Sequence, residues 1–329
     1  RKSEKSSETV YEFAARRIGR EAAQKLVGAM VLGVYGGDAE QLEMVSCFPR
    51  LAEMEARYGS LFRALRARRR ENPGASPMGP GGWLTSFSGG VETLAETAAG
   101  KLKNALRPGV SAAAVTRQGA AYQIETDSGL TVSARRLFLA CPSWQAARLV
   151  APMHERGALA LERIPYAPIA VIALGYAREH VGHPLDGFGF LVPRGESMRL
   201  LGCLWTSSIF PDQAPAGHVL LRIMMGGAVD PDALRMSDGE LLNAALAELK
   251  TLLRLSGSPL WTRIYRYERG IPQYTLGHAE RLAALANMER TLPGVYLCGN
   301  AYHGVGLNDC VISATGAVAR ALGAASHEQ

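Results

Sequence analysis

The sequence predicts a mixed α/β (α+β) fold for this chain of 329 residues, and three observations support that prediction. Residues 164–227 contain closely spaced apolar and alternating runs, which are typical of strands in an antiparallel sheet. Residues 9–30 and 238–255 carry apolar side chains at three- and four-residue spacing, as amphipathic helices do. Near the C-terminus, a short apolar run, a glycine-rich loop and a helical pattern follow one another within residues 292–322.

Composition indicates an ordinary globular protein of about two domains. Hydrophobic residues make up 47% of the chain and charged residues 20%, so the chain can bury a sizeable core. It contains neither an apolar run long enough to span a bilayer nor a signal peptide at its polar, charged N-terminus. We therefore expect a cytoplasmic protein.

The chain is basic, with a net charge of +6 and a pI of about 9.1. Much of this charge lies in one predicted helical segment, at Arg57, Arg63, Arg66, Arg68, Arg69 and Arg70. The favoured interpretation is a solvated helix face. Contact with an acidic ligand or peripheral attachment to the inner face of the cell membrane is the alternative. Few aromatic residues and no reader motif accompany the arginines, which argues against a nucleic-acid partner.

Cysteine and histidine spacing gives no sign of a metal centre. The five cysteines are scattered without close pairs, at Cys47, Cys141, Cys203, Cys298 and Cys310. This pattern argues against a zinc site and against a disulfide framework, and it fits a reducing cytosol. His180 and His183 are three residues apart, but they lie in a predicted loop with no further ligand nearby.

In the first part of the chain, we expect a helix over residues 9–30, a turn over 33–38, and continued helical structure over 42–65. Residues 71–82 are rich in Pro, Gly and Asn and predict a loop. A short strand, a Gly89-Gly90 turn and an amphipathic helix follow. Short strands are then expected over 110–116, 122–126, 131–133 and 136–140.

We predict that the C-terminal part begins with a helix over residues 238–255 and that the Ser256–Pro259 segment ends this helix. A strand over residues 261–267 and a helix over 279–288 come next. Val295–Cys298 reads as a buried strand, Gly299, Gly304 and Gly306 open a loop, and helical periodicity begins at Asn308.

The loop between this strand and helix is a candidate ligand site. Glycine lets the backbone approach a ligand closely, and a helix N-terminus offers unpaired N–H groups and partial positive charge. Such an end suits an anion or the electron-rich edge of a redox ring. The alternative is a capping loop, with Asn308 or Asp309 as the cap. Gly304 and Gly306 lack a third glycine at the dinucleotide-binding spacing, so the loop is not that fingerprint.

Several of these segments resemble the protoporphyrinogen oxidases, which are relatives of the flavin amine oxidases. The C-terminal match is Gly299–Tyr302 followed by Gly304–Cys310, and a second telling match is Ile271-Pro272-Gln273-Tyr274 with Gly277-His278. Leu185–Pro193 and Leu201–Pro211 match the family almost residue for residue. Further matches are Val34–Asp38 with Leu42 and Met44, and Phe87 with Gly89-Gly90. The resemblance runs from about Thr9 to Leu322.

The resemblance implies an FAD-linked oxidoreductase fold and the oxidation of protoporphyrinogen IX to protoporphyrin IX in heme biosynthesis. FAD would take hydride from the porphyrinogen, with oxygen as the acceptor. By position, the implied FAD contacts are Ala112, Tyr267, Val305, Gly306 and Leu307, and the implied substrate contacts are Phe188, Leu191 and Met224. For each substrate contact, plain core packing is the alternative. We expect no catalytic base, and a structural role for His278 is at least as well supported as a chemical one.

No G-x-G-x-x-G motif occurs in the chain. We therefore expect a protein that lacks the N-terminal Rossmann portion of the family and binds FAD poorly by itself. The expected division is a helical substrate- or membrane-facing domain at 1–82, part of the FAD domain at 83–150, a substrate-binding sheet domain at 151–275, and the C-terminal part of the FAD domain at 276–329.

Three alternatives to protoporphyrinogen oxidation stay open. The substrate could be coproporphyrinogen III, although the Asn308-Asp309 form of the motif favours protoporphyrinogen. The chain could be another flavin amine oxidase or desaturase relative, or an inactive truncated remnant. The oligomeric state, a homodimer or otherwise, is also open.

Overall fold

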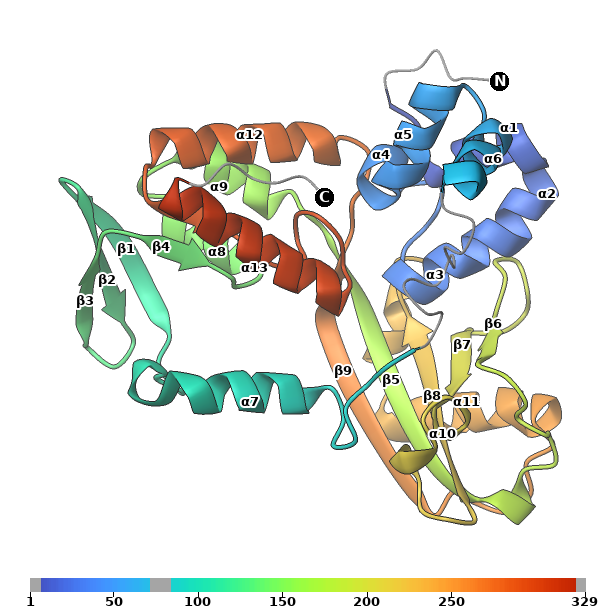
Figure 1. The fold of residues 1–329 in the computed structure, drawn as a ribbon. Helices are drawn as coiled ribbons and strands as arrows, with labels where there is room; N and C mark the ends of the chain where they lie inside the picture. Colours follow the sequence, from blue (N-terminus) through green and yellow to red (C-terminus); the bar gives the residue numbers. More distant parts are fainter. Residues whose placement is uncertain (1–6, 72–83, 324–329) are drawn as a thin grey trace. The chain divides into compact units, whose positions relative to one another are not determined.

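A computed structural model describes residues 7–71 and 84–323 and divides the chain into two compact units (Figure 1). Unit 1 combines residues 1–41, 49–103 and 167–271, and unit 2 combines residues 42–48, 104–166 and 272–329. Both units are therefore built from segments that lie far apart in the sequence. The four-domain division expected from the sequence stays a prediction.

A five-stranded sheet forms the centre of unit 1, with the strand order β6-β7-β8-β5-β9 (Figure 1). Its strands are β5 (Tyr166–Ala177), β6 (Gly189–Leu191), β7 (Leu200–Trp205), β8 (His218–Gly226) and β9 (Trp261–Pro272). The pairs β6–β7, β7–β8 and β5–β8 are antiparallel. The antiparallel sheet predicted for residues 164–227 is thus confirmed.

One face of this sheet packs against α11 (Asp238–Leu252). A capping box formed by Ser237 and Glu240 starts this helix, which was predicted from its apolar spacing. Side chains that alternate along β5 and β8 point into the shared core. Its largest members include Ile172, Leu174, Tyr176, Leu221, Ile223, Met225, Leu241 and Leu249.

The other face of the sheet is covered more thinly, by α3 (Ala29–Tyr35). Leu32, Ile169 and Leu201 form a small buried cluster there, and partly buried Val171 and Met224 pack against it. Helix α3 approaches the sheet so closely that a Cβ atom on Gly33 would lie 2.6 Å from a methyl carbon of Leu191. Any larger residue at position 33 would therefore need the Leu191 side chain to shift.

The N-terminal helix predicted over residues 9–30 is interrupted in the structure. It consists of α1 (Val10–Ile18), α2 (Arg20–Ala22) and a π-helical segment, Ala23–Gly28. The break occurs at Gly19, whose φ of +88° is incompatible with a continuous helix. Further helices of unit 1 are α5 (Pro49–Tyr58), α6 (Leu61–Glu71), α7 (Glu92–Leu102) and α10 (Thr206–Ile209).

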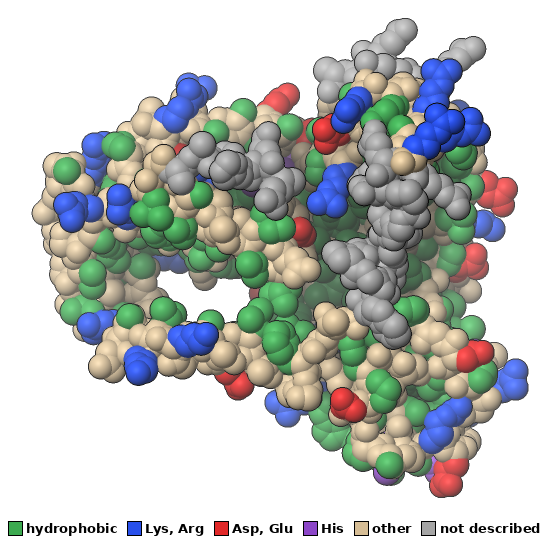
Figure 2. Space-filling model, viewed as in Figure 1, with side chains coloured by type: hydrophobic (Ala, Val, Ile, Leu, Met, Phe, Trp, Pro, Cys, Tyr) green, Lys and Arg blue, Asp and Glu red, His purple; other side chains and the backbone are tan. Residues whose placement is uncertain are grey.

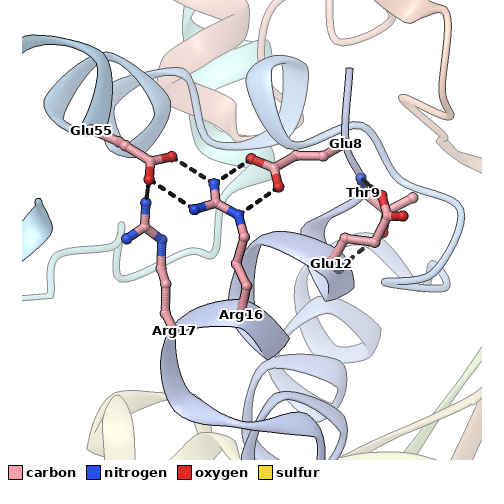
Figure 3. Close-up of polar contacts among 6 residues, drawn as sticks. All are labelled: Glu8, Thr9, Glu12, Arg16, Arg17 and Glu55. Atoms are coloured by element: carbon pink, nitrogen blue, oxygen red, sulfur yellow. Dashed lines mark hydrogen bonds and ion pairs between the residues drawn. The ribbon is translucent and has the colours of Figure 1, made fainter. Parts of the chain in front are cut away.

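Charged side chains join α1 to α5 in a largely buried cluster (Figure 3). The Arg16 guanidinium lies between two carboxylates, 2.6 Å from Glu8 and 2.7 Å from Glu55. Arg17 pairs with Glu55 as well. Since Glu55 is only 6% exposed, removing one partner would leave charge buried without compensation.

The basic segment foreseen at residues 57–70 lies on α5 and α6, where Lys and Arg side chains gather at the surface (Figure 2). Arg63 and Arg66 are exposed, and so are Phe62 (86%) and Leu65 (57%) of the same helix. Helix α6 thus exposes both charged and apolar side chains. Its contact with a membrane stays a prediction. No helix within the described ranges is both long and apolar enough to cross a bilayer.

Unit 2 contains two small sheets and four main helices. Strands β1 (Ala112–Gln118), β2 (Ala121–Thr126) and β3 (Thr131–Ala134) form an antiparallel meander, while β4 (Leu137–Leu139) pairs in parallel with β10 (Val295–Leu297). The helices are α8 (Ser143–Val150), α9 (Glu155–Glu162), α12 (His278–Thr291) and α13 (Leu307–Leu322), and the short α4 (Met44–Cys47) joins them. The four strands β1–β4 and the helices α12 and α13 match the predicted ones to within a few residues, whereas the helical stretch expected over 42–65 is divided into α4, α5 and α6.

Two predicted features fall at the edge of the described chain. The loop expected at 71–82 lies outside the described residues, apart from Glu71 at the end of α6. Residues 84–86 are described and do not form the short strand that was expected there. The turn that follows is present, with the Gly90 N–H bonded to the Phe87 carbonyl at 2.8 Å.

Candidate functional site

The glycine loop, defined here as residues 299–306, connects β10 to α13 in unit 2. Its backbone takes conformations that L-residues rarely adopt, with φ of +119° at Gly299 and +101° at Gly304. A Cβ atom on Gly304 would lie 2.4 Å from the carboxyl carbon of Asp309. No side chain fits there, so the sequence must supply glycine.

Helix α13 begins directly behind this loop. The Asp309 carboxylate accepts a hydrogen bond of 2.9 Å from the Gly306 N–H, and the Gly299 N–H donates to the Ser313 hydroxyl at 3.0 Å. The N-cap residue is therefore Gly306, and not Asn308 or Asp309 as predicted, while Asp309 takes part in the cap from the third position of the helix. Leu307 and Asn308 are exposed, and their first-turn N–H groups lie at the positive end of a sixteen-residue helix.

The predicted cofactor contacts Val305, Gly306 and Leu307 are consecutive at this helix start. All three are exposed or half-exposed, so a bound ring could reach their backbone atoms. A glycine-rich loop that leads into a helix N-terminus would suit the electron-rich edge of a flavin. Capping and ligand binding are thus compatible roles for the same segment.

Tyr274 lies beneath the glycine loop and is completely buried. Its hydroxyl donates to the Asn300 carbonyl at 2.5 Å and accepts from the Gly304 N–H at 2.8 Å. One phenol oxygen therefore bridges two backbone groups on either side of the turn. The motif that resembles the protoporphyrinogen oxidases and the loop that resembles their flavin segment are bonded to each other.

His278, at the start of α12, packs against the same tyrosine. Its ring stacks on Tyr274 with 4.2 Å between centroids, and its Nε2 atom lies 3.2 Å from the Tyr302 carbonyl. Burial lowers the pKa of His278 to about 4, although the hydrogen bond to Tyr302 acts in the opposite direction. The ring is neutral near pH 7, with Nε2 as the donor, so His278 is structural.

Glu43 holds the start of α12 from a distant part of the sequence. Its buried carboxylate accepts from the Gly277 N–H at 3.0 Å and from the Ala279 N–H at 2.9 Å. Its own N–H donates to the Tyr274 carbonyl at 2.7 Å. Sequence reasoning singled out the flanking Leu42 and Met44 but missed Glu43; an acidic residue between two apolar ones was the available signal.

Ala112, the predicted contact for the adenine end of FAD, lies at the start of β1. Its pairing with β2 is irregular between Ala112 and Ala114, and the residue is exposed. It lines a cavity of about 660 Å³ within unit 2. Other walls of this cavity come from β4 and α8 and include Phe138, Cys141, Gln145 and Arg148.

Tyr267, the remaining predicted cofactor contact, lies on β9. Its side chain is 49% exposed, so its ring is accessible to a ligand. It belongs to unit 1, whereas the other four predicted contacts belong to unit 2.

Two of the three predicted substrate contacts are neighbours on the thinly covered face of the unit 1 sheet. Leu191 of β6 lies opposite Gly202 of β7, which lies opposite Met224 of β8. Cross-strand partners share one face of a sheet, so these residues form a row, which Val171 of β5 continues. Leu191 is 40% exposed and Met224 half-buried, so this row is not closed core.

Phe188, the third predicted substrate contact, precedes β6 and lies outside the row. Its carbonyl accepts a hydrogen bond of 2.9 Å from the Trp205 N–H, and its side chain is 55% exposed. Its ring is therefore available to a ligand, but the strand pairing does not align it with Leu191 and Met224.

Acidic, histidine and cysteine side chains form no cluster of three or more that could hold a metal ion within residues 7–71 and 84–323. That the site needs no catalytic base stays a prediction.

Comparison with known proteins gives a consistent family. The model of the family described as flavin containing amine oxidoreductase matches residues 1–322. The coproporphyrinogen III oxidase of Bacillus subtilis is 30% identical and covers 97% of this chain. The protoporphyrinogen oxidase 1 of Arabidopsis thaliana chloroplasts is also 30% identical and covers 92%. The chain spans 68% and 61% of the lengths of these two relatives.

Solved structures agree with the fold. A protein from Exiguobacterium sp. 255-15, named provisionally as a protoporphyrinogen oxidase, superposes with a TM-score of 0.82 at 28% identity. The match covers 98% of this chain and 68% of that one. Reduced UDP-galactopyranose mutase gives a TM-score of 0.72 at 16% identity, covering all of this chain and 70% of the other. The second likeness concerns the fold alone.

Proposed function

This chain belongs to the flavin containing amine oxidoreductase family, and from that premise we propose that it takes part in oxidising a porphyrinogen to a porphyrin in heme biosynthesis. The family contains flavin, which confirms FAD as the expected cofactor at the level of the family. The relatives named coproporphyrinogen III oxidase and protoporphyrinogen oxidase support the substrate class.

The observation that carries the proposal is the bonding between two segments of unit 2. The Tyr274–His278 segment belongs to one of the two telling matches to the protoporphyrinogen oxidases, and it supports the glycine loop through hydrogen bonds to Asn300, Tyr302 and Gly304. A loop that needs glycine, rigid support and a helix N-terminus behind it fits a planar redox ring better than a plain connection does.

When bound, FAD supplies hydride acceptance, and the chain supplies binding and orientation. Backbone atoms of Val305, Gly306 and Leu307 would hold the ring, with Ala112 at the adenine end and Tyr267 as a further contact. The Leu191–Met224 row would give the tetrapyrrole an apolar wall that excludes water, with Phe188 beside it. No residue need act as a general base, and oxygen would reoxidise the cofactor.

Protoporphyrinogen IX is the preferred substrate in this proposal. Coproporphyrinogen carries propionates where protoporphyrinogen carries two vinyl groups, and the described wall of Leu191, Met224 and Val171 offers no charge to pair with extra carboxylates. The Asn308-Asp309 form of the loop favours the same substrate. Coproporphyrinogen III is the second candidate, because the Bacillus subtilis relative is named for it.

The test is a flavin spectrum followed by a porphyrin assay. Because the chain is expected to bind FAD poorly by itself, FAD is kept in excess, and porphyrin fluorescence is followed after either porphyrinogen is added, with FAD alone as the control. We expect a flavin spectrum altered by binding and, under air, growth of fluorescence above the rate with FAD alone, faster with protoporphyrinogen than with coproporphyrinogen. Bound flavin without any rate above autoxidation on either substrate would contradict the proposed function.

A further inference from the structure

Three backbone atoms of the glycine loop are held by two side chains from one short segment. Tyr274 bonds the Asn300 carbonyl and the Gly304 N–H, and His278 bonds the Tyr302 carbonyl between them. These contacts hold the 300–301, 302–303 and 303–304 peptide groups of the loop. The stacking of the two rings at 4.2 Å makes the two side chains a single support.

The support is completely buried, which makes its hydrogen bonds consequential. Tyr274 and His278 are both 0% exposed, so the polar atoms between them and the loop are shielded from water. A carbonyl or N–H that loses its partner in such a place cannot easily replace it with solvent. The Tyr274 hydroxyl serves a donor and an acceptor at once, so its removal affects both sides of the turn.

A second tyrosine in the same loop is a contrast. Tyr302 is 4% exposed, yet its hydroxyl has no hydrogen-bond partner within the part of the chain that the structure describes. Burial raises the pKa of Tyr302, so its phenol stays protonated. The two buried tyrosines therefore differ in role. The Tyr274 hydroxyl bonds the loop backbone, whereas the Tyr302 hydroxyl bonds no group that the structure describes.

We propose that Tyr274 is a positioning residue that sets the conformation of the glycine loop through its hydroxyl, with His278 bracing its ring. The effect of Tyr274 on flavin binding rests on the proposed function. Tyr274 acts through the loop backbone and does not itself contact the ring that Val305–Leu307 would hold. The loop is thereby preorganised before the cofactor arrives, which spares part of the ordering cost of binding.

The first test needs no cofactor. Amide hydrogen exchange is measured at residue resolution on the full chain, and we expect the Gly304 N–H to exchange at least about tenfold more slowly than the Val305 N–H, for which the described structure gives no hydrogen bond. In Tyr274→Phe, we expect Gly304 exchange to rise about tenfold, whereas Tyr302→Phe leaves it unchanged. Equal exchange at Gly304 and Val305 in the wild type would overturn the proposal, even if the variant failed to fold.

The second test uses the flavin as a reporter. In Tyr274→Phe, FAD affinity falls about tenfold and the flavin absorbance bands shift, whereas Tyr302→Phe changes neither. A spectrum and an affinity identical to those of the wild type would overturn the positioning role. FAD is supplied in excess, because the chain alone is expected to bind it weakly. If binding by the wild type is too weak to measure, the exchange result decides how the loop is held.

Discussion

His278 links the stability of unit 2 to pH. Its pKa is about 4 in the folded chain and about 6.5 in an unfolded one, so between these values the unfolded state binds the proton more readily. The stabilisation is complete above about pH 6.5 and is lost as the pH falls towards 4. Arg281 and His303 face this ring and disfavour its charge, while Glu43 favours it.

We therefore expect the wild type to lose more stability than His278→Gln when the pH is lowered from 7.5 to 4.5. Glutamine retains an N–H donor for the Tyr302 carbonyl but does not titrate. The difference in the free energy of unfolding, measured with urea at both pH values, should be about 2 kcal/mol. Parallel losses in the two proteins would show that His278 is not the titrating group.

The roles of some residues could be predicted from the sequence, and the roles of others could not. The glycines and the structural role of His278 followed from local patterns, and the described geometry agrees with them. The tasks of Tyr274 and Glu43 did not, because their partners lie 26–30 and 234–236 residues away. No periodicity encodes such a bond; it exists only once the segments have folded together.

Helix α12 depends on a carboxylate that it does not contain. Replacing Glu43 by Gln removes one of the two acceptors at the helix N-terminus and the negative charge there. We expect a loss of about 1–3 kcal/mol in the free energy of unfolding. Glu280→Gln is the matched control, because Glu280 is exposed in the first turn of the same helix and should cost under about 1 kcal/mol. Equal losses would contradict the role assigned to Glu43.

Among whole elements, long periodic segments were predicted well and their interruptions were not. Helix α11 was recognised from its apolar spacing, and its capping box sets its start. The break at Gly19 escaped notice, because a single glycine inside a helical pattern is usually tolerated. The positive φ there arises from how the N-terminal helices pack, which local spacing does not contain.

Unit 2 exposes an apolar surface. Side chains of α13 are exposed at Val311 (52%), Ile312 (68%), Val318 (47%) and Leu322 (69%), and the parallel sheet beside it has only two strands. Parallel sheets normally have both faces covered and more strands. We expect the purified chain to bind a hydrophobic dye and to self-associate as its concentration rises.

The double variant Ile312→Lys with Leu322→Lys should reduce both dye fluorescence and concentration-dependent light scattering several-fold. Thr315→Lys is the control, since it adds charge to the same exposed helix without removing an apolar side chain. If the control lowers association as much as the double variant does, net charge rather than apolar surface is responsible.

At the scale of the molecule, the mixed fold class and the antiparallel sheet were predicted from the sequence, and the path of the chain was not. Residues 42–48 belong to unit 2, although the segments before and after them in the sequence belong to unit 1. Their composition is that of an ordinary helical stretch. What places them is the set of bonds from Glu43 to the start of α12, which forms only in three dimensions.

The parallel pairing of β4 with β10 has a consequence for synthesis on the ribosome. Leu137 pairs with Val295, so β4 emerges long before its partner has been translated. At roughly 5–20 residues per second, that strand waits on the order of ten seconds or more with its edge open. This strand is therefore a place where a chaperone would help the nascent chain, and slowing translation between the two strands should lower the yield of folded protein.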